Sequence, residues 1–200
     1  MQTELPTSSE DTIAFLKSYG ALEEGHFLLA SGNHSNFFVK KGKLVQHPWE
    51  LQQMIEQRAD AMRALGGIEV VLSPAMGGVP VGQQVGLALH ARTIYAERNA
   101  KSNEMELKRG FEIEKGEGVI LVEDVITTGG TLLELVDFVT GRGGEIRGIF
   151  VLVNRSGKQE IGGIPVVSCM EIELPVYPPD AVPDWLEAVP VVRPGTKRVE

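Results

Sequence analysis

The chain has 200 residues, 42% of them hydrophobic, and a formal net charge of −8 at pH 7. This length and composition fit one domain with a substantial core. The acidic charge argues against a broad nucleic-acid surface, which needs clustered Lys and Arg. There is no signal peptide pattern and no apolar run near the roughly 20 residues of a membrane span, and Cys169 is the single cysteine, so we expect a cytoplasmic protein without a disulfide.

The N-terminal third predicts a helix, a hairpin and a second helix. Serine caps and a closing glycine delimit a short amphipathic helix over residues 8–20. Two apolar stretches around a polar turn predict a β-hairpin over residues 25–39, with Phe37 and Phe38 on its return. A proline opens a longer helix, whose apolar face continues over residues 48–67 until two glycines end it.

Strands alternate with helices through the middle of the chain, from residue 68 to residue 153. This alternation predicts an α/β fold, with a doubly wound, mostly parallel sheet flanked by helices. The turn at residues 73–80 leads from a strand into a helix and forms a candidate anion cradle. A charged loop follows over residues 97–109, and six of the eleven prolines lie beyond residue 174, so we expect an extended, irregular tail.

The most informative stretch is Gly118 to Thr131. An apolar strand is followed at once by Glu123 and Asp124, then by a Thr-Thr-Gly-Gly-Thr turn and an apolar helix. Such a turn exposes backbone N–H groups and the positive end of a helix dipole, which suits a phosphate. Carboxylates beside a phosphate need another partner, such as sugar hydroxyls, a metal ion or a developing cation, and a phosphorylated ribose supplies these. The alternative is that the two acids only cap the helix.

This stretch resembles the phosphoribosyl-pyrophosphate (PRPP) signature of the type I phosphoribosyltransferases. It is neither a Walker A loop nor a Rossmann glycine pattern. Further segments recur in this order in orotate phosphoribosyltransferases: Gly25 to Phe38, Pro74 to Gly78, Lys108 to Phe111, Val153 to Gly157 and Leu174 to Pro178. The resemblance implies a type I phosphoribosyltransferase fold over residues 1–200, with a core at about 48–158 and a small hood subdomain from about 8–47 and 159–185.

The resemblance also implies the reaction. A member of this family forms orotidine 5′-monophosphate and pyrophosphate from orotate and PRPP with Mg²⁺, in pyrimidine synthesis. Glu123 and Asp124 would be catalytic, and Mg²⁺ would arrive on PRPP, with Asp124 as its one candidate protein ligand. The PRPP-binding residues would be Glu123, Asp124, Val125, Ile126, Thr127, Thr128, Gly129, Gly130, Thr131, Ala75, Met76, Gly77, Arg98 and Lys101. Orotate would meet Thr127, Arg155, Phe37 and Phe38.

Three departures from the familiar bacterial pattern leave alternatives open. Gly77 and Ala30 stand where familiar members carry lysines, and residues 97–111 contain no histidine. We expect a homodimer in which loop 97–111 acts as a lid across the interface, but an ordinary surface loop is an equal alternative. A phosphoribosyltransferase for another nucleobase and a PRPP-binding regulator of low activity also remain open.

Overall fold

The computed structural model describes residues 4–29 and 31–194. The helices are α1 (Ser9–Ser18), α2 (Gly42–Val45), α3 (Pro48–Glu56), α4 (Ala59–Arg63), α5 (Val79–Leu89), α6 (Gly130–Thr140) and α7 (Asp184–Glu187). The strands are β1 (Leu22–Leu28), β2 (His34–Val39), β3 (Val70–Pro74), β4 (Arg92–Arg98), β5 (Met105–Leu107), β6 (Gly118–Ile126), β7 (Glu145–Asn154), β8 (Glu160–Ile161), β9 (Ile164–Glu171) and β10 (Val191–Val192). None of the described helices is long and apolar enough to cross a membrane.

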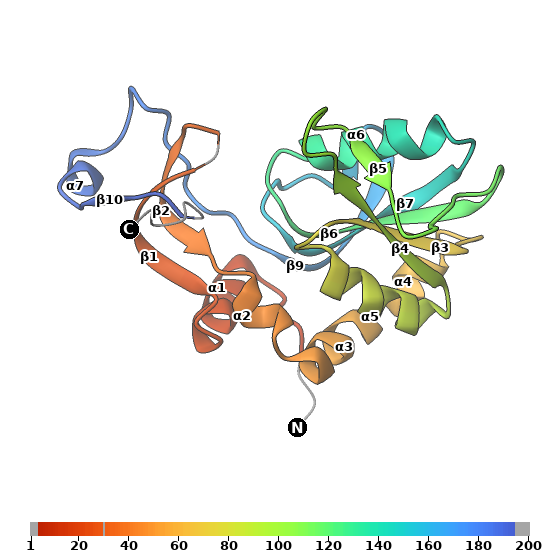
Figure 1. Ribbon diagram of the computed structural model, residues 1–200. Coiled ribbons are helices and arrows are strands. Elements are labelled where there is room, and N and C mark those ends of the chain that lie inside the picture. The colour runs from red at the N-terminus through yellow and green to blue at the C-terminus, as the bar shows by residue number, and fades with distance from the viewer. Residues whose placement is uncertain (1–3, 30, 195–200) are drawn as a thin grey trace.

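The strands form two sheets, which Figure 1 shows in separate parts of the molecule. The larger sheet has seven strands in the order β5-β4-β3-β6-β7-β9-β8. Its five inner strands are parallel, and only the two edge strands run antiparallel to their neighbours. The predicted mostly parallel α/β sheet is therefore confirmed, and the carboxyl ends of β3, β6 and β7 meet at one edge.

Alternate residues of the inner strands face different helices, as expected for strands buried on both sides. Val71 and Ile120 pack in one hydrophobic cluster with residues of α3, α4 and α5. Leu72 and Leu121 belong to the other cluster, together with Leu132 and further residues of α6. The core sheet therefore separates two apolar layers, and α6 covers the face opposite α5.

The hood is a three-stranded sheet in the order β10-β1-β2, with α1 packed nearby. The predicted helix and hairpin are both present, and the Ser8 side chain caps α1 by accepting a hydrogen bond from the Asp11 N–H at 3.1 Å. The C-terminal tail returns to this sheet, because β10 pairs with β1. His34 and Tyr177 exchange two backbone hydrogen bonds that hold the tail against β2.

Three predicted segments differ in the structure. The helix expected over residues 48–67 divides into α3 and α4, because Arg58 leaves helical geometry with φ −109° and ψ 0°. The loop expected over residues 97–109 contains a β-hairpin, since β5 pairs with the end of β4. The hood boundary expected at residue 159 also differs, because β9 pairs in parallel with β7 and extends the core sheet. The C-terminal region before residue 172 is therefore part of the core.

Candidate active site

The acidic pair lies within β6, because the strand continues to Ile126 and passes through both carboxylates. Asp124 is 1% exposed, and its Oδ1 accepts a hydrogen bond from the Val125 N–H at 2.7 Å. Glu123 is partly exposed, and its Oε1 accepts a hydrogen bond from the Asp124 N–H at 3.1 Å. The strand thus presents two adjacent carboxylates immediately before the threonine-glycine turn, as the sequence predicted.

The two carboxylates differ in their surroundings. Burial raises the pKa of Glu123 to about 8, and the neighbouring charge of Asp124 adds to the increase, while Lys41 opposes it. Asp124 instead has a cation in contact, since Lys41 Nζ lies 2.9 Å from its Oδ1 and 2.7 Å from its Oδ2. At neutral pH the pair therefore combines a protonated Glu123 with an ion-paired Asp124, and a ligand that binds both carboxylates must change this arrangement.

The turn at Thr127 to Gly129 joins the end of β6 to the start of α6. Gly129 is the N-cap of α6 with φ 86°, and a Cβ at this position would lie 2.9 Å from Ile161 Cδ1, so the turn requires glycine. A cavity of about 210 Å³ opens here, lined by Glu123 and residues 125–132. The N-cap residue Gly129 offers no side-chain acceptor, and the Gly130 N–H makes only a long hydrogen bond, 3.5 Å, to the Thr128 hydroxyl, so the first turn of α6 can donate N–H groups to an anion.

A second turn lies beside the acidic pair and leads from β3 into α5. Met76 is 79% exposed there, whereas Gly77 packs directly against Asp124 of β6. A Cβ on Gly77 would lie 2.2 Å from Asp124 Oδ2, so any larger residue would require the Asp124 side chain to move. The fold therefore brings residues 75–78 and the carboxylates together, although they are almost fifty positions apart in the chain.

Arg155 follows β7 at the same edge, and its N–H donates a hydrogen bond to the Ile126 carbonyl at 2.9 Å. Its side chain is partly buried, and its Nε has no hydrogen-bond partner among the described residues. Burial lowers the pKa of this guanidinium, and none of the carboxylates in the described part of the chain pairs with it. A buried cation without a carboxylate partner, next to Thr127, suits an anionic group of a ligand.

The comparisons with known proteins agree with this geometry. Residues 43–180 match the phosphoribosyl transferase domain family. Orotate phosphoribosyltransferases of Heliobacterium modesticaldum and Chlorobaculum parvum are 37% and 39% identical to the chain over 191 residues. These alignments cover 95% of this chain and 99% and 97% of the two relatives. The chain belongs to the orotate phosphoribosyltransferase family.

Solved structures support the same fold. An orotate phosphoribosyltransferase from Aeropyrum pernix superimposes with a TM-score of 0.64 at 25% identity, over 79% of this chain and 92% of that one. An adenine phosphoribosyltransferase from Rhodothermus marinus gives a TM-score of 0.57 at 22% identity, over 68% of this chain and 86% of that one. The type I phosphoribosyltransferase fold is therefore confirmed, and the sequence relatives, rather than the fold, distinguish the orotate family from the adenine family.

Two residues that the family resemblance assigned to PRPP lie in the β4–β5 hairpin. Arg98 pairs with Glu134 of α6 and also donates a hydrogen bond to the Asn103 carbonyl at 2.8 Å. Lys101 is exposed at the hairpin tip, with no side-chain partner among the described residues. In this conformation Arg98 is therefore held by an acid outside the phosphate turn, and Lys101 is the basic residue of the tip that has no ion pair among the described residues.

The two aromatic residues assigned to the base lie on β2 of the hood. Both are partly buried, and the ring of Phe38 lies 5.6 Å from that of Phe27 on the neighbouring strand. Phe37 packs against the hydrophobic cluster that continues into the core. Their contacts in the structure are thus with apolar residues of the fold. Ala30, where familiar orotate phosphoribosyltransferases carry a lysine, lies outside the described residues.

Lys41 is the residue of the site that sequence reasoning missed. It precedes α2 in the hood, yet its ammonium reaches Asp124 of the core across 83 positions of sequence. The one available signal was the basic pair Lys40-Lys41 directly after a predicted hairpin. That signal is weak, because lysines are mostly exposed, and only the tertiary structure brings Lys41 to the carboxylate.

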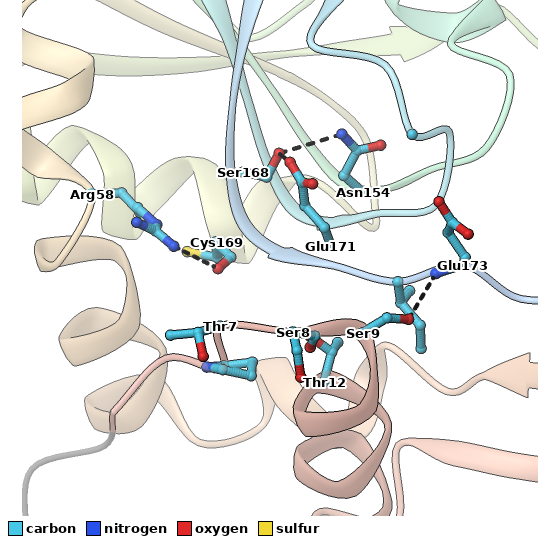
Figure 2. Close-up of a pocket in the computed structure, with 13 residues that line it drawn as sticks. Thr7, Ser8, Ser9, Thr12, Arg58, Asn154, Ser168, Cys169, Glu171 and Glu173 are labelled. Atoms are coloured by element: carbon cyan, nitrogen blue, oxygen red, sulfur yellow. Dashed lines mark hydrogen bonds between the residues drawn. The ribbon is translucent and has the colours of Figure 1, made fainter.

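A larger cavity, of about 440 Å³, lies between the hood and the core beside the Arg155 loop. Figure 2 shows Ser8, Ser9 and Thr12 at the start of α1 facing Ser168 and Glu171 of β9. Asn154, at the end of β7, also lines it. The Asn154 amide organises the loop that carries Arg155, because it accepts hydrogen bonds from Ser156 and donates one to the Lys158 carbonyl. This cavity does not include residues 123–131.

Proposed function

We propose that the protein transfers the 5-phosphoribosyl group of PRPP to orotate, giving orotidine 5′-monophosphate and pyrophosphate in pyrimidine synthesis. Its membership of the orotate phosphoribosyltransferase family supports this reaction. The observation that favours orotate as the base is the Arg155 guanidinium beside the phosphate turn. It is partly buried and has no carboxylate partner among the described residues. Among nucleobases, orotate has a carboxylate that can supply that charge.

The proposed placement of PRPP follows from three groups at the carboxyl edge of the sheet. The 5′-phosphate binds the backbone N–H groups and hydroxyls of residues 127–131, where α6 begins. The ribose 2′- and 3′-hydroxyls bind Glu123 and Asp124. The pyrophosphate binds the turn of Ala75, Met76 and Gly77, which packs against Asp124. The distance between these groups is set by the neighbouring strands β3 and β6.

Bond formation in this proposal needs charge stabilisation from the chain. N1 of orotate attacks the anomeric carbon as the bond to pyrophosphate breaks, and positive charge develops on the ribose. The N1 proton is released to pyrophosphate or to solvent. The carboxylates of Glu123 and Asp124, which sit beneath the ribose, stabilise that charge. Arg155 and Thr127 orient orotate, and Phe37 and Phe38 approach the base from the hood. The electron pair of the broken bond leaves with pyrophosphate. The chain accelerates the reaction by orienting the two substrates and by placing fixed charges around them.

Mg²⁺ forms part of the proposal as a companion of PRPP. The described residues contain no group of three or more His, Cys, Asp or Glu side chains that could cage a metal. The two adjacent carboxylates fit the usual binding of Mg²⁺, which takes one or two carboxylates together with substrate phosphates. Asp124 is the residue that would hold it, and the ion would neutralise the charge of the pyrophosphate.

The assembly and location complete the proposal. We propose a homodimer in which the hairpin of residues 97–111 covers the partner's site as a lid, because Lys101 offers an uncompensated charge at its tip. The cytoplasmic location expected from the sequence remains part of this proposal.

Pyrophosphate release tests the function directly. Purified protein is incubated with PRPP and Mg²⁺ and with orotate, uracil, adenine, hypoxanthine or xanthine in parallel. We expect turnover with orotate alone. Turnover with a different base would refute the role assigned to Arg155 but keep the PRPP site. Binding of PRPP without turnover on any base would instead favour the regulator.

A further inference from the structure

Lys41 contacts two parts of the proposed PRPP site, Asp124 and Gly77. Its ammonium forms an ion pair with Asp124, at 2.7 Å from Oδ2. Gly77 lies beside the same group, since a Cβ there would be 2.7 Å from the Nζ atom. Lys41 therefore lies where the carboxylate proposed to bind ribose meets the turn proposed to bind pyrophosphate.

Exposure distinguishes the two partners of this ion pair. The Asp124 side chain is 2% exposed, whereas the Lys41 side chain is 50% exposed. An ammonium has three N–H donors, and one carboxylate does not use all of them in this geometry. Lys41 thus keeps donor capacity that a ligand entering beside Gly77 can use.

Three of the four basic side chains of the β4–β5 hairpin, all except Lys101, are held in ion pairs and are less available to pyrophosphate. Arg98 pairs with Glu134, Lys108 with Glu106, and Arg109 with Glu97. Pyrophosphate would also lie close to Glu123 and Asp124, and the Asp124 carboxylate repels it. A cation at the position of Lys41 offsets that repulsion at the atoms concerned, because its ammonium is already in contact with one of the two acids.

We propose that Lys41 is a PRPP-binding residue whose ammonium holds the pyrophosphate group. This inference rests on the proposed function and assigns to a hood residue the charge that Gly77 cannot carry. When PRPP binds, the ammonium exchanges one of its contacts with Asp124 for a pyrophosphate oxygen. It then stabilises the negative charge that develops as the bond between the anomeric carbon and pyrophosphate breaks, and it transfers no proton.

Glycine at position 77 follows from the same arrangement. Any side chain there would meet both the Asp124 carboxylate and the Lys41 ammonium. The Lys41 ammonium therefore occupies space that a side chain at position 77 would otherwise fill.

Equilibrium binding of two ligand fragments tests the proposal. We compare Lys41→Met with Lys40→Met, a matched control whose lysine pairs with Glu23 in the hood. Isothermal titration calorimetry measures magnesium pyrophosphate and ribose 5-phosphate separately on each variant. We expect Lys41→Met to weaken pyrophosphate binding about 10- to 100-fold, as the loss of a charge-assisted hydrogen bond does, and ribose 5-phosphate binding to stay the same or tighten. Lys40→Met should match the wild-type protein for both ligands.

The fragments separate direct contact from a structural role. If Lys41 only neutralised Asp124, its removal would disturb the ribose site, and both fragments would lose affinity together. Equal loss of both fragments, or no loss of pyrophosphate binding, overturns the proposal. If Lys41→Met does not fold, Lys41→Gln, which keeps a hydrogen-bond donor to Asp124, is judged by the same criteria. Turnover of PRPP and orotate by the wild-type protein tests the proposed function separately. If the wild-type protein turns over both substrates and Lys41→Met binds pyrophosphate normally, only the inference about Lys41 fails.

Discussion

Arg155 carries a guanidinium into a partly buried position, where its Nε has no hydrogen-bond partner among the described residues. Burial lowers its pKa and disfavours its charged form, so the free protein sustains a cost that an anionic ligand removes. The family resemblance assigned Arg155 to orotate, although arginines are mostly exposed. The structure supports a role in binding the base.

Replacement of Arg155 by Met tests that role. We expect the KM for orotate to rise about 10- to 100-fold, because charge-assisted hydrogen bonds to the carboxylate are lost, and the KM for PRPP to change little. Steady-state kinetics with each substrate varied in turn measure both values. The melting temperature should stay the same or increase, since methionine keeps the apolar stem and removes an unpaired charge.

Arg142→Met is the matched control, because Arg142 stacks on Phe138 at the far end of α6. This variant should keep both KM values. An equal increase in the two KM values for Arg155→Met would contradict a specific role in the base site.

Glu123 makes stability depend on pH in a defined direction. Its pKa is raised from 4.5 to about 8 in the folded protein, chiefly by burial, so the folded state holds a proton that the unfolded chain releases. Between these two pKa values the folded state binds more protons, and this group's contribution to stability falls as pH rises. Above about pH 8 both states are ionised and the contribution is constant.

Glu123→Gln removes this dependence, because glutamine has the shape of the protonated acid and cannot ionise. We expect the melting temperatures of the variant and the wild-type protein to be similar near pH 5. At pH 8.5 the variant should melt higher by about 3 °C or more, since about 1 kcal/mol shifts a domain of this size by about 2–4 °C. The exposed Glu114→Gln should follow the wild-type curve at both pH values. A constant difference across this range would show that Glu123 is not protonated in the folded protein.

The β4–β5 hairpin is the segment for which a lid and an ordinary surface loop are the two interpretations. Pairing of β5 with β4 and the ion pairs of Lys108 and Arg109 give it internal order. Residues 97–109 were expected to be a charged loop, because the many charged residues around the short strand Met105–Leu107 obscure its strand pattern in the sequence. Local propensity could not show that this strand completes a sheet edge.

Lys101 provides the test of the hairpin. We expect Lys101→Ala to raise the KM for PRPP about 3- to 10-fold, because the unpaired ammonium at the tip would reach the phosphates when the hairpin closes. The KM for orotate should change less. Lys115→Ala, which removes an exposed lysine from another turn, is the control in the same assay. An unchanged KM for PRPP would support the surface loop.

The assembly of the whole molecule can be tested with mixed dimers. Light scattering should first show a dimer in solution. The Asp124→Asn protein and an Arg98→Ala/Lys101→Ala protein should each have low activity, because one lacks a carboxylate at the ribose and the other lacks the hairpin charges. If the hairpin acts across the interface, mixing the two after dissociation and reassociation should restore activity, since one site in each hybrid receives an intact hairpin and an intact carboxylate.

The expected recovery approaches one quarter of wild-type activity, because about half of the dimers are hybrids with one complete site each. No recovery in a mixture shown to contain hybrid dimers would mean that the hairpin serves its own subunit.

The sequence by itself determined the central strand-turn-helix, the hood hairpin, the mostly parallel sheet and the family. These features depend on local signals: hydrophobic period, capping residues, glycines, and the order of short motifs along the chain. The boundaries of β9 and of the divided helix depended on pairing and packing with distant segments, so periodicity could not set them.

Only the tertiary structure decided how charge is arranged at the site. It paired Lys41 with Asp124, enclosed Glu123 so that its pKa rose, placed Gly77 against both acid and ammonium, and left Arg155 without a partner. Burial and distances between charges set electrostatic energies, and both arise when residues far apart in the chain are brought together. The sequence could therefore identify the acidic pair and the phosphate turn, whereas the Lys41 ammonium beside Asp124 and Gly77 became visible only in the folded chain.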